Sequence, residues 1–366
     1  MAVGAVVLSI GMVGIFAAPA GMTLVGNLAW VIAFFGLATV GFTMVAIPYG
    51  AQAGEITQDP KERSAMTGWR MGFASVGILI GGAVIPGLAG EMGYAAAAFA
   101  VTPLMIGAVW VSLWATRNAP RIATATTVDL RRMYQLVLRN RPFMCLVALY
   151  GVMTFAIALI TAGLPLAAIY LIVDNGATAL SGAAAALSTL SLMFAAFVVG
   201  AILSQVIWVL LSSRFGKSNT LAAGLCLYAV LLVALYNSLP SVNVTAIAAL
   251  FVLAGIANGS YQQIPWAMYP DLMDVTRSES GQAIEGAFSA VWLFGQKIAN
   301  ALAPAVLGLI LAQSGWLAST GDIVTQNSQA LSALQVVISL VPAAILVTAA
   351  FCVKWIYKPM VSHAGR

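Results

Sequence analysis

The sequence predicts an all-α polytopic membrane protein with about ten transmembrane helices. Of its 366 residues, 61% are hydrophobic and only 7% are charged, and the mean hydropathy is +0.98. A water-soluble domain carries about a quarter charged residues, so most of this surface must face lipid. The apolar runs are too long and too uniform for the alternating strands of an outer-membrane barrel, which are about ten residues each.

Ten apolar segments are long enough to cross a hydrocarbon core of about 30 Å. They cover residues 2–19, 25–51, 65–90, 93–115, 143–172, 183–212, 219–238, 244–268, 286–313 and 331–355. The first is not typical of a cleavable signal peptide, because it lacks a basic flank and another span follows at once.

Basic residues in the short loops predict the orientation of these spans. The loop from Arg117 to Arg141 holds six arginines and a single acid, Asp129, so we expect it in the cytoplasm. Counting spans outward from this loop places both termini in the cytoplasm as well. The net charge of +5 therefore reflects membrane topology and does not indicate nucleic-acid binding.

Two segments of the chain resemble each other at an offset of 217 residues: IPYGAQAGE at 47–55 and IPWAMYPD at 264–271. The same offset maps spans 219–238 and 244–268 onto the first two spans. It maps spans 143–172 and 183–212 to positions before Met1. The pattern is typical of a transporter built from two related halves, with four spans in the first half and six in the second.

The predicted domains follow from this repeat. They are an incomplete N-terminal helical half of four spans (1–116), a basic cytoplasmic linker (117–142), a C-terminal helical half of six spans (143–358) and a cytoplasmic tail (359–366). A truncated gene model, a fragment, a degenerate paralogue and a natural ten-helix protein are all compatible with the pattern. The DNA upstream of Met1 would distinguish them.

Residues 47–82 resemble the loop between the fourth and fifth helices of the glycoside-pentoside-hexuronide cation symporters, the melibiose-permease-like branch of the major facilitator superfamily. Residues 264–311 are similar to the tenth and eleventh helices of that family. The resemblance implies a major-facilitator-type bundle in a bacterial inner membrane. It also implies secondary active transport of a sugar or glycoside by alternating access, coupled to Na⁺ or H⁺, with membrane lipids and a small polar substrate as partners. We expect a monomer.

The resemblance also raises the alternative that the chain is inactive in this form. Family members place cation-binding acids on their first two helices, a region with no counterpart here. Ala46 stands where one family member has a further acid, and Thr43 matches a cation-site threonine. A non-transporting pseudotransporter or regulatory protein and a carrier of another amphiphile, such as a lysolipid, remain open.

Lys297 lies near the middle of an apolar span, about eleven residues or roughly 17 Å from its predicted cytoplasmic end. A lysine at such a depth costs at least ~2.5 kcal/mol to insert. All eleven acids of the chain lie in loops or at span ends, so no partner carboxylate is expected near the midplane. The lysine is therefore neutral, solvated in a cavity, or matched to acids outside this sequence.

A sugar site needs hydrogen-bonding groups together with an aromatic face. Arg70, the second intramembrane base, lies only about five residues inside its span, where it could act as a gate or as a snorkelling anchor. The candidate substrate residues are Tyr49, Trp69, Arg70, Tyr261, Gln263, Trp266, Trp292, Gln296 and Lys297, with Thr43 as a candidate cation ligand.

Opposite charges flank the predicted cytoplasmic mouth in both copies of the repeat, and we expect them to form a gate. The candidate gate residues are Glu55, Asp59, Glu62, Arg63, Asp271, Asp274, Arg277 and Glu285. The glycine pairs Gly77/Gly81 and Gly255/Gly259 predict close helix packing. Enzyme activity, a metal site and an organic cofactor are not expected, because no nucleotide loop, metal-ligand cluster or nucleophile triad occurs.

Overall fold

A computed structural model describes residues 1–56, 60–119, 130–280, 285–318 and 323–364. This part of the chain is almost entirely helical and holds no β-strand. Its elements are α1 (Ala2–Phe16), α2 (Leu24–Glu55), α3 (Pro60–Leu79), the π-helical turn η1 (Ile80–Val84), α4 (Ile85–Met92), α5 (Tyr94–Ala115), α6 (Leu130–Arg139), α7 (Arg141–Tyr170), α8 (Ser181–Leu187), α9 (Thr189–Phe215), α10 (Lys217–Ser238), α11 (Val244–Ser280), α12 (Glu285–Gln313), α13 (Ser328–Ile338), α14 (Leu340–Cys352), η2 (Val353–Tyr357) and α15 (Lys358–Ala364).

Helices occupy all ten predicted spans, which confirms the polytopic all-α class. Within the described residues, eight helical segments are long and apolar enough to cross a membrane. The remaining two spans correspond to α1, a shorter apolar helix of 15 residues, and to the continuous α3, η1 and α4.

The prediction that a span ends at residue 268 was wrong, because α11 continues to Ser280 and contains Pro265 and Pro270. Prolines are tolerated in buried helices when other donors satisfy the carbonyls that they free. Pro265 and Pro270 remove the bonds to the carbonyls of Tyr261 and Trp266, four residues earlier. Two other carbonyls of the same helix accept bonds from neighbouring segments: Lys217 Nζ lies 2.8 Å from the Ala267 carbonyl oxygen, and Asn140 Nδ2 lies 3.3 Å from that of Leu272.

Two predicted spans are interrupted near their middle or end. The span at 183–212 is divided into α8 and α9 by Ser188, a non-glycine residue with a φ of +69°. The span at 331–355 is divided into α13 and α14 at Ser339. Breaks and π-helical turns of this kind change the direction in which the following side chains point.

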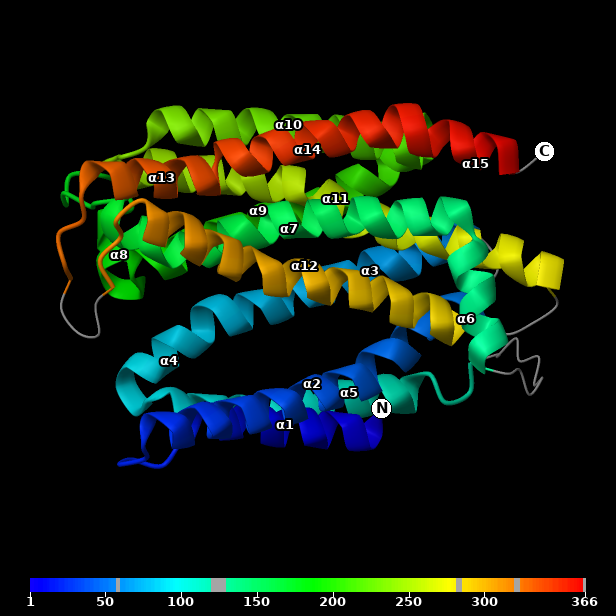
Figure 1. Ribbon diagram of the computed structural model, residues 1–366, viewed down its shortest axis with the longest axis horizontal. Helices are drawn as coiled ribbons and strands as arrows, with labels where there is room; N and C mark the ends of the chain where they lie inside the picture. Colours follow the sequence, from blue (N-terminus) through cyan, green and yellow to red (C-terminus); the bar gives the residue numbers. More distant parts are fainter. Residues whose placement is uncertain (57–59, 120–129, 281–284, 319–322, 365–366) are drawn as a thin grey trace.

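The helices form two groups that are joined by α3 and α12 (Figure 1). On one side α1 packs against α2 and α5, and on the other side α7, α9, α10, α11 and α14 enclose the main hydrophobic core. Only 6% of the most apolar window of α2 is buried within the protein, against 56% for α11. The core therefore lies mainly in the C-terminal half, and most of α2 presents its side chains outward.

The tightest helix packing joins α9 to α11. A Cβ atom on Gly255 would lie 1.9 Å from the Phe197 carbonyl oxygen, and one on Gly200 would lie 2.0 Å from that of Val252. Gly259 is similarly close to Ser204, so the packing prediction for Gly255 and Gly259 is confirmed. It was wrong for Gly77 and Gly81, where no atom lies within 4 Å of an added Cβ.

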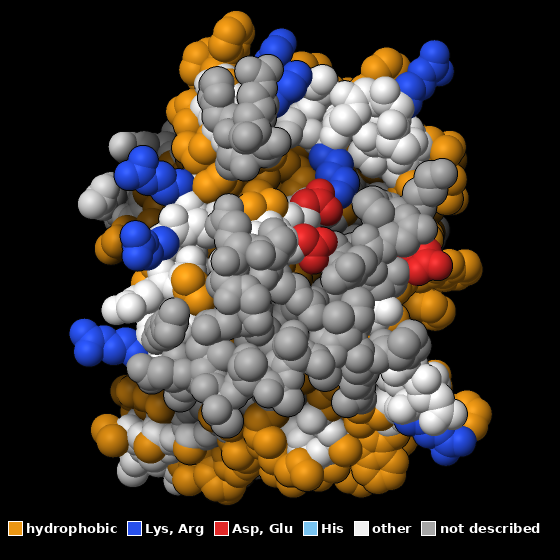
Figure 2. Space-filling model, turned by 90° about the vertical axis from the view of Figure 1, so that its right-hand side faces the viewer, with side chains coloured by type: hydrophobic (Ala, Val, Ile, Leu, Met, Phe, Trp, Pro, Cys, Tyr) orange, Lys and Arg blue, Asp and Glu red, His pale blue; other side chains and the backbone are white. Residues whose placement is uncertain are grey.

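Both termini and α6 lie toward the same end of the molecule (Figure 1). Figure 2 views this end and shows Lys and Arg side chains around its rim, with Asp and Glu side chains near its middle. The helix α6 belongs to the packed structure, since Val137 is fully buried against the main core.

Candidate substrate site

Five aromatic side chains, which we call the aromatic cluster, pack at the junction of α7, α11 and α12. They are Tyr150, Tyr261, Trp266, Tyr269 and Trp292, and each is at most 9% exposed. The ring of Trp292 stacks between those of Tyr150 and Tyr269, at centroid distances of 4.2 and 5.1 Å. Trp266 meets Trp292 nearly edge-on at 5.7 Å.

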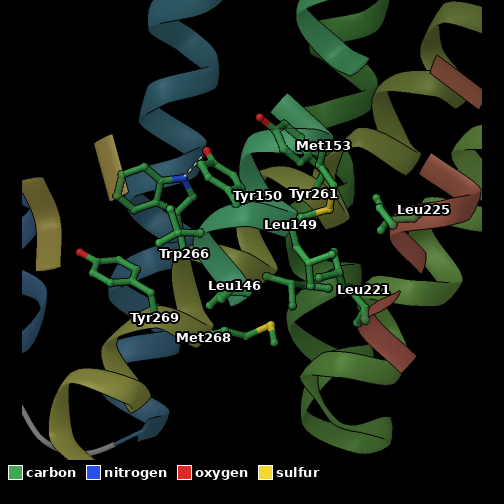
Figure 3. Close-up of a cluster of buried hydrophobic side chains, with 14 of the residues drawn as sticks. Leu146, Leu149, Tyr150, Met153, Leu221, Leu225, Tyr261, Trp266, Met268 and Tyr269 are labelled. Atoms are coloured by element: carbon green, nitrogen blue, oxygen red, sulfur yellow. Dashed lines mark hydrogen bonds between the residues drawn. The ribbon is translucent and has the colours of Figure 1, made fainter. Parts of the chain in front are cut away.

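The Tyr150 hydroxyl organises the polar edge of the aromatic cluster. It accepts hydrogen bonds from Trp266 Nε1 at 3.0 Å and from Gln296 Nε2 at 3.2 Å. Figure 3 shows the bond from Trp266. The rings of Tyr150 and Tyr261 stack with their centroids 5.5 Å apart. The two hydrogen bonds hold the Trp266 and Gln296 side chains in fixed orientations. The Tyr150 hydroxyl still has its own proton to donate.

Tyr150 and Tyr269 were not among the predicted substrate residues. Tyr269 lies one helical turn after Trp266 on α11, within the quoted IPWAMYPD segment, so helical spacing could have found it. Tyr150 lies in the apolar run of α7, where no local pattern distinguishes it from a core residue.

Arg70 connects α3 to the aromatic cluster. Its guanidinium carbon lies 4.7 Å from the ring centroid of Tyr49 on α2 and 4.2 Å from that of Trp266. A planar guanidinium that stacks on aromatic faces keeps its N–H donors directed sideways, where they can reach a ligand. No carboxylate in the described residues forms an ion pair with Arg70, and its side chain is half-buried.

Lys297 lies one residue beyond Gln296 on α12 and faces α2. Its Nζ lies 3.4 Å from Thr43 Oγ1 and 4.8 Å from the ring centroid of Phe42. Thr43 in turn donates its hydroxyl to the Thr39 carbonyl at 2.8 Å. The predicted substrate lysine and the predicted cation-site threonine are therefore neighbours, and no described acid pairs with the lysine.

Three side chains near these residues bury a polar atom that has no hydrogen-bond partner in the described part of the chain. They are Gln263 Oε1, Ser289 Oγ and Trp292 Nε1. A buried polar atom left unpaired costs about 1–3 kcal/mol, and all three atoms are covered by the surrounding side chains. Tyr261 differs, because its hydroxyl and that of Thr154 are 2.8 Å apart.

The structure thus brings together most of the predicted substrate residues. Tyr49, Arg70, Tyr261, Trp266, Trp292 and Gln296 join through the aromatic cluster. Trp69 does not join them: it is 73% exposed and stacks on Phe73 at 6.2 Å. Gln263 is buried on α11 but contacts none of the five rings through a hydrogen bond within the described residues.

Only part of the predicted charged gate can be placed. Asp59 and the side chains of Glu55, Arg63, Arg277 and Glu285 lie outside the described residues. Asp271 binds Lys217 at 2.6 Å, so this ion pair joins α10 to α11 within the C-terminal half. Glu62 is exposed and Asp274 is half-buried.

A direct contact between the two halves lies beside the predicted gate. The Tyr269 hydroxyl donates to the Gly50 carbonyl oxygen of α2 at 2.9 Å. A Cβ atom on Gly50 would lie 3.1 Å from Ser289 Oγ. Three helices, α2, α11 and α12, therefore meet closely at Gly50.

Comparison with known proteins places the whole chain in a transporter fold. The crystal structure of a fucose:proton symporter of E. coli superposes with a TM-score of 0.56 at 13% identity, over 96% of this chain and 82% of the symporter. A bacterial homologue of the iron transporter ferroportin, in an outward-facing state, gives 0.59 at 12% identity, covering 98% and 82%. These similarities show the major facilitator fold.

Curated relatives share more sequence with the chain. A putative glycoside/cation symporter of Escherichia coli is 24% identical over 342 residues, which cover 91% of this chain and 70% of the relative. A putative sulfoquinovose importer of Salmonella typhimurium is 25% identical over 352 residues, covering 92% and 69%. A glucuronide carrier protein homolog of Escherichia coli is 26% identical, covering 86% and 67%.

The family model described as MFS/sugar transport protein matches residues 1–358, nearly the whole chain. The resemblance identified from residues 47–82 and 264–311 is thereby confirmed. The transporter fold and the relatives also confirm that the chain is not an enzyme. This membrane-spanning chain belongs to the MFS/sugar transport protein family.

Proposed function

We propose that the protein carries a sugar or glycoside across a bacterial inner membrane, by alternating access and in symport with Na⁺ or H⁺. The observation that carries this proposal is the placement of Arg70 between Tyr49 and Trp266. This placement puts the Arg70 guanidinium, with its N–H donors, against the aromatic cluster, where residues of both halves meet. Aromatic faces and oriented donors are the two elements that sugar recognition needs.

The polar edge of the cluster supplies the remaining donors and acceptors. Gln296 is half-buried and presents its amide beside the Tyr150 hydroxyl, to which it donates. In this proposal the sugar contacts the half-buried ring of Tyr49 and takes hydrogen bonds from Arg70 and Gln296.

Cation coupling is assigned to the pair formed by Lys297 and Thr43. Their separation of 3.4 Å links α12 to α2, which lie in different halves. An ion that competes with the Lys297 amine for the Thr43 oxygen would break this contact between α12 and α2. A symporter needs ion binding to favour one of its conformational states over the other. Whether Na⁺ or H⁺ does so is a matter for experiment.

Uptake into proteoliposomes tests the proposal. The full chain is supplied with labelled neutral glycosides, a pentoside, a hexuronide and a sulfonated sugar, each under a Na⁺ gradient, a pH gradient or no gradient. We expect one sugar class to accumulate under one gradient, and Arg70→Ala to abolish that uptake. Absence of gradient-dependent uptake for every sugar, with protein that remains folded and inserted, would contradict transport and favour a non-transporting role. Uptake of a lysolipid alone would indicate an amphiphile carrier.

A further inference from the structure

An apolar groove with a volume of about 710 Å³ runs along the outer face of the C-terminal half, between α10 and α14. The buried side chains of Ala229 and Ala343 form its floor, and the exposed Val230 and Val347 form its walls. Figure 1 shows α10 and α14 side by side on the side of the molecule farthest from α1, α2 and α5. The groove therefore opens toward the surrounding membrane.

One end of the groove leads to basic and aromatic side chains. The groove-lining face of α14 continues in the exposed Phe351 and Trp355, whose rings are 6.0 Å apart. Lys354 Nζ lies 5.9 Å from the Trp355 ring centroid. Lys358 Nζ, at the start of α15, donates to Asn219 Oδ1 of α10 at 3.0 Å, so this bond joins α10 to the segment that follows α14.

The positive charge at this end is not balanced by described residues. Lys354 and Lys358 are exposed, and neither forms an ion pair with an acid in the described part of the chain. Asp271 belongs to the same end but is bound to Lys217 at 2.6 Å. Figure 2 shows Lys and Arg side chains along the upper edge, the edge at which α10 and α14 lie in Figure 1.

We propose that the groove between α10 and α14 binds an anionic phospholipid. An acyl chain lies along the alanine floor, Lys354 and Lys358 bind the headgroup phosphate, and Trp355 lies at the level of the glycerol. The residues from Leu340 to Thr348 provide about 12 Å of groove at 1.5 Å per residue, which matches a substantial part of one leaflet. Basic side chains close to the membrane surface attract anionic lipids, and tryptophan favours the interface.

A second copy of the chain fits this surface less well. A two-fold axis along the membrane normal would bring the same face of both copies together at the same level. Lys354 and Lys358 of one copy would then approach those of the other copy, and like charges in contact oppose association. The charge pattern therefore favours a lipid.

Native mass spectrometry of the full chain in detergent, titrated with palmitoyl-oleoyl phosphatidylglycerol, tests the proposal. We expect one phosphatidylglycerol to be retained more strongly than phosphatidylcholine. The double variant Lys354→Gln/Lys358→Gln should weaken its binding about 30-fold, because a lysine near anionic headgroups contributes about fivefold. Ala344→Phe, at an exposed position in the groove, should weaken it in the same direction.

Matched controls separate this site from general membrane contact. Arg214→Gln removes an exposed cation at the end of α9, and Leu227→Phe enlarges an exposed side chain on α10 that does not line the groove. Both should leave phosphatidylglycerol binding unchanged. Equal retention of the two lipids, or equal binding by the charge variant and its control, would overturn the proposal. A dimer that Ala344→Phe dissociates would also overturn it, by showing that a second copy fills the groove.

Discussion

Tyr269 and Gly50 join the two halves of the protein through a hydrogen bond, from the tyrosine hydroxyl to the glycine carbonyl oxygen at 2.9 Å. The bond requires α2 to lie close to α11 and α12, and a Cβ at position 50 would crowd Ser289 Oγ at 3.1 Å. If the protein works by alternating access, this junction must open and close during transport.

Gly50→Val should reduce transport strongly while the protein still inserts into membranes. The added side chain would start 3.1 Å from Ser289 Oγ and would hold α2 away from α12. Gly36→Val is the matched control, since it lies on the same helix and no atom is within 4 Å of an added Cβ. Initial uptake rates of the two variants give the comparison. Equal rates would show that α2 need not approach α12 at this point.

Tyr150→Phe should lower both stability and sugar affinity. It removes the acceptor of Trp266 Nε1 and Gln296 Nε2, and one buried unpaired donor costs about 1–3 kcal/mol. Thermal unfolding in detergent and the KM for uptake measure the two effects. Tyr170→Phe serves as the control, because that ring packs edge-on against Trp316 and its hydroxyl forms no hydrogen bond within the described residues. Unchanged stability and KM would mean that the hydroxyl has no organising role.

Arg70→Lys should weaken sugar binding while keeping the positive charge. A lysine cannot stack flat between Tyr49 and Trp266, and the lost cation–π contacts are worth about 0.5–2 kcal/mol, or roughly 2- to 30-fold in Kd. Isothermal titration with the transported sugar measures the change. Arg214→Lys, which alters an exposed arginine 5.4 Å from the ring centroid of Phe215, should bind the sugar normally. A lysine variant with parental affinity would contradict the role of stacking.

Lys297→Ala should abolish gradient-driven accumulation more than it reduces membrane insertion. The substitution removes the 3.4 Å contact with Thr43 and with it the proposed link between ion and sugar. Accumulation under a gradient and exchange without one are measured on the same vesicles, with the inserted amount determined by immunoblot. Thr43→Val should impair accumulation in the same direction and leave the amine in place. If Lys297→Ala accumulates sugar as the parent does, the lysine is not part of the coupling.

Gly255→Ala should destabilise the protein by about 1–3 kcal/mol, the usual cost of overpacking a close contact. The new methyl group would lie 1.9 Å from the Phe197 carbonyl oxygen, so α9 and α11 must separate. Gly77→Ala, which meets no atom within 4 Å, should be neutral or slightly stabilising because alanine favours a helix. Unfolding midpoints in denaturant compare the two. Similar midpoints would show that the α9–α11 interface can relax.

Composition and the length of the apolar runs were enough to predict the membrane class and the approximate positions of its helices. They were sufficient because an apolar segment of this length can satisfy its backbone hydrogen bonds in lipid only by forming a helix. The same reasoning placed Arg70 and Lys297 as the two cations within the spans, and the paired IPY and IPW segments pointed to the helices that carry much of the site.

Tertiary structure alone decided which of those side chains meet. Trp69 and Arg70 are adjacent in sequence, yet one stacks on Phe73 at the surface and the other lies on Trp266. In the sequence nothing distinguishes Tyr150 from a core residue. In the structure its hydroxyl accepts hydrogen bonds from Trp266 of α11 and Gln296 of α12. The C-terminal part of α11 likewise accepts hydrogen bonds from Lys217 and Asn140, which belong to other segments. Burial along one helix follows from local sequence, whereas these contacts depend on the packing of helices far apart in the chain, which local periodicity does not encode.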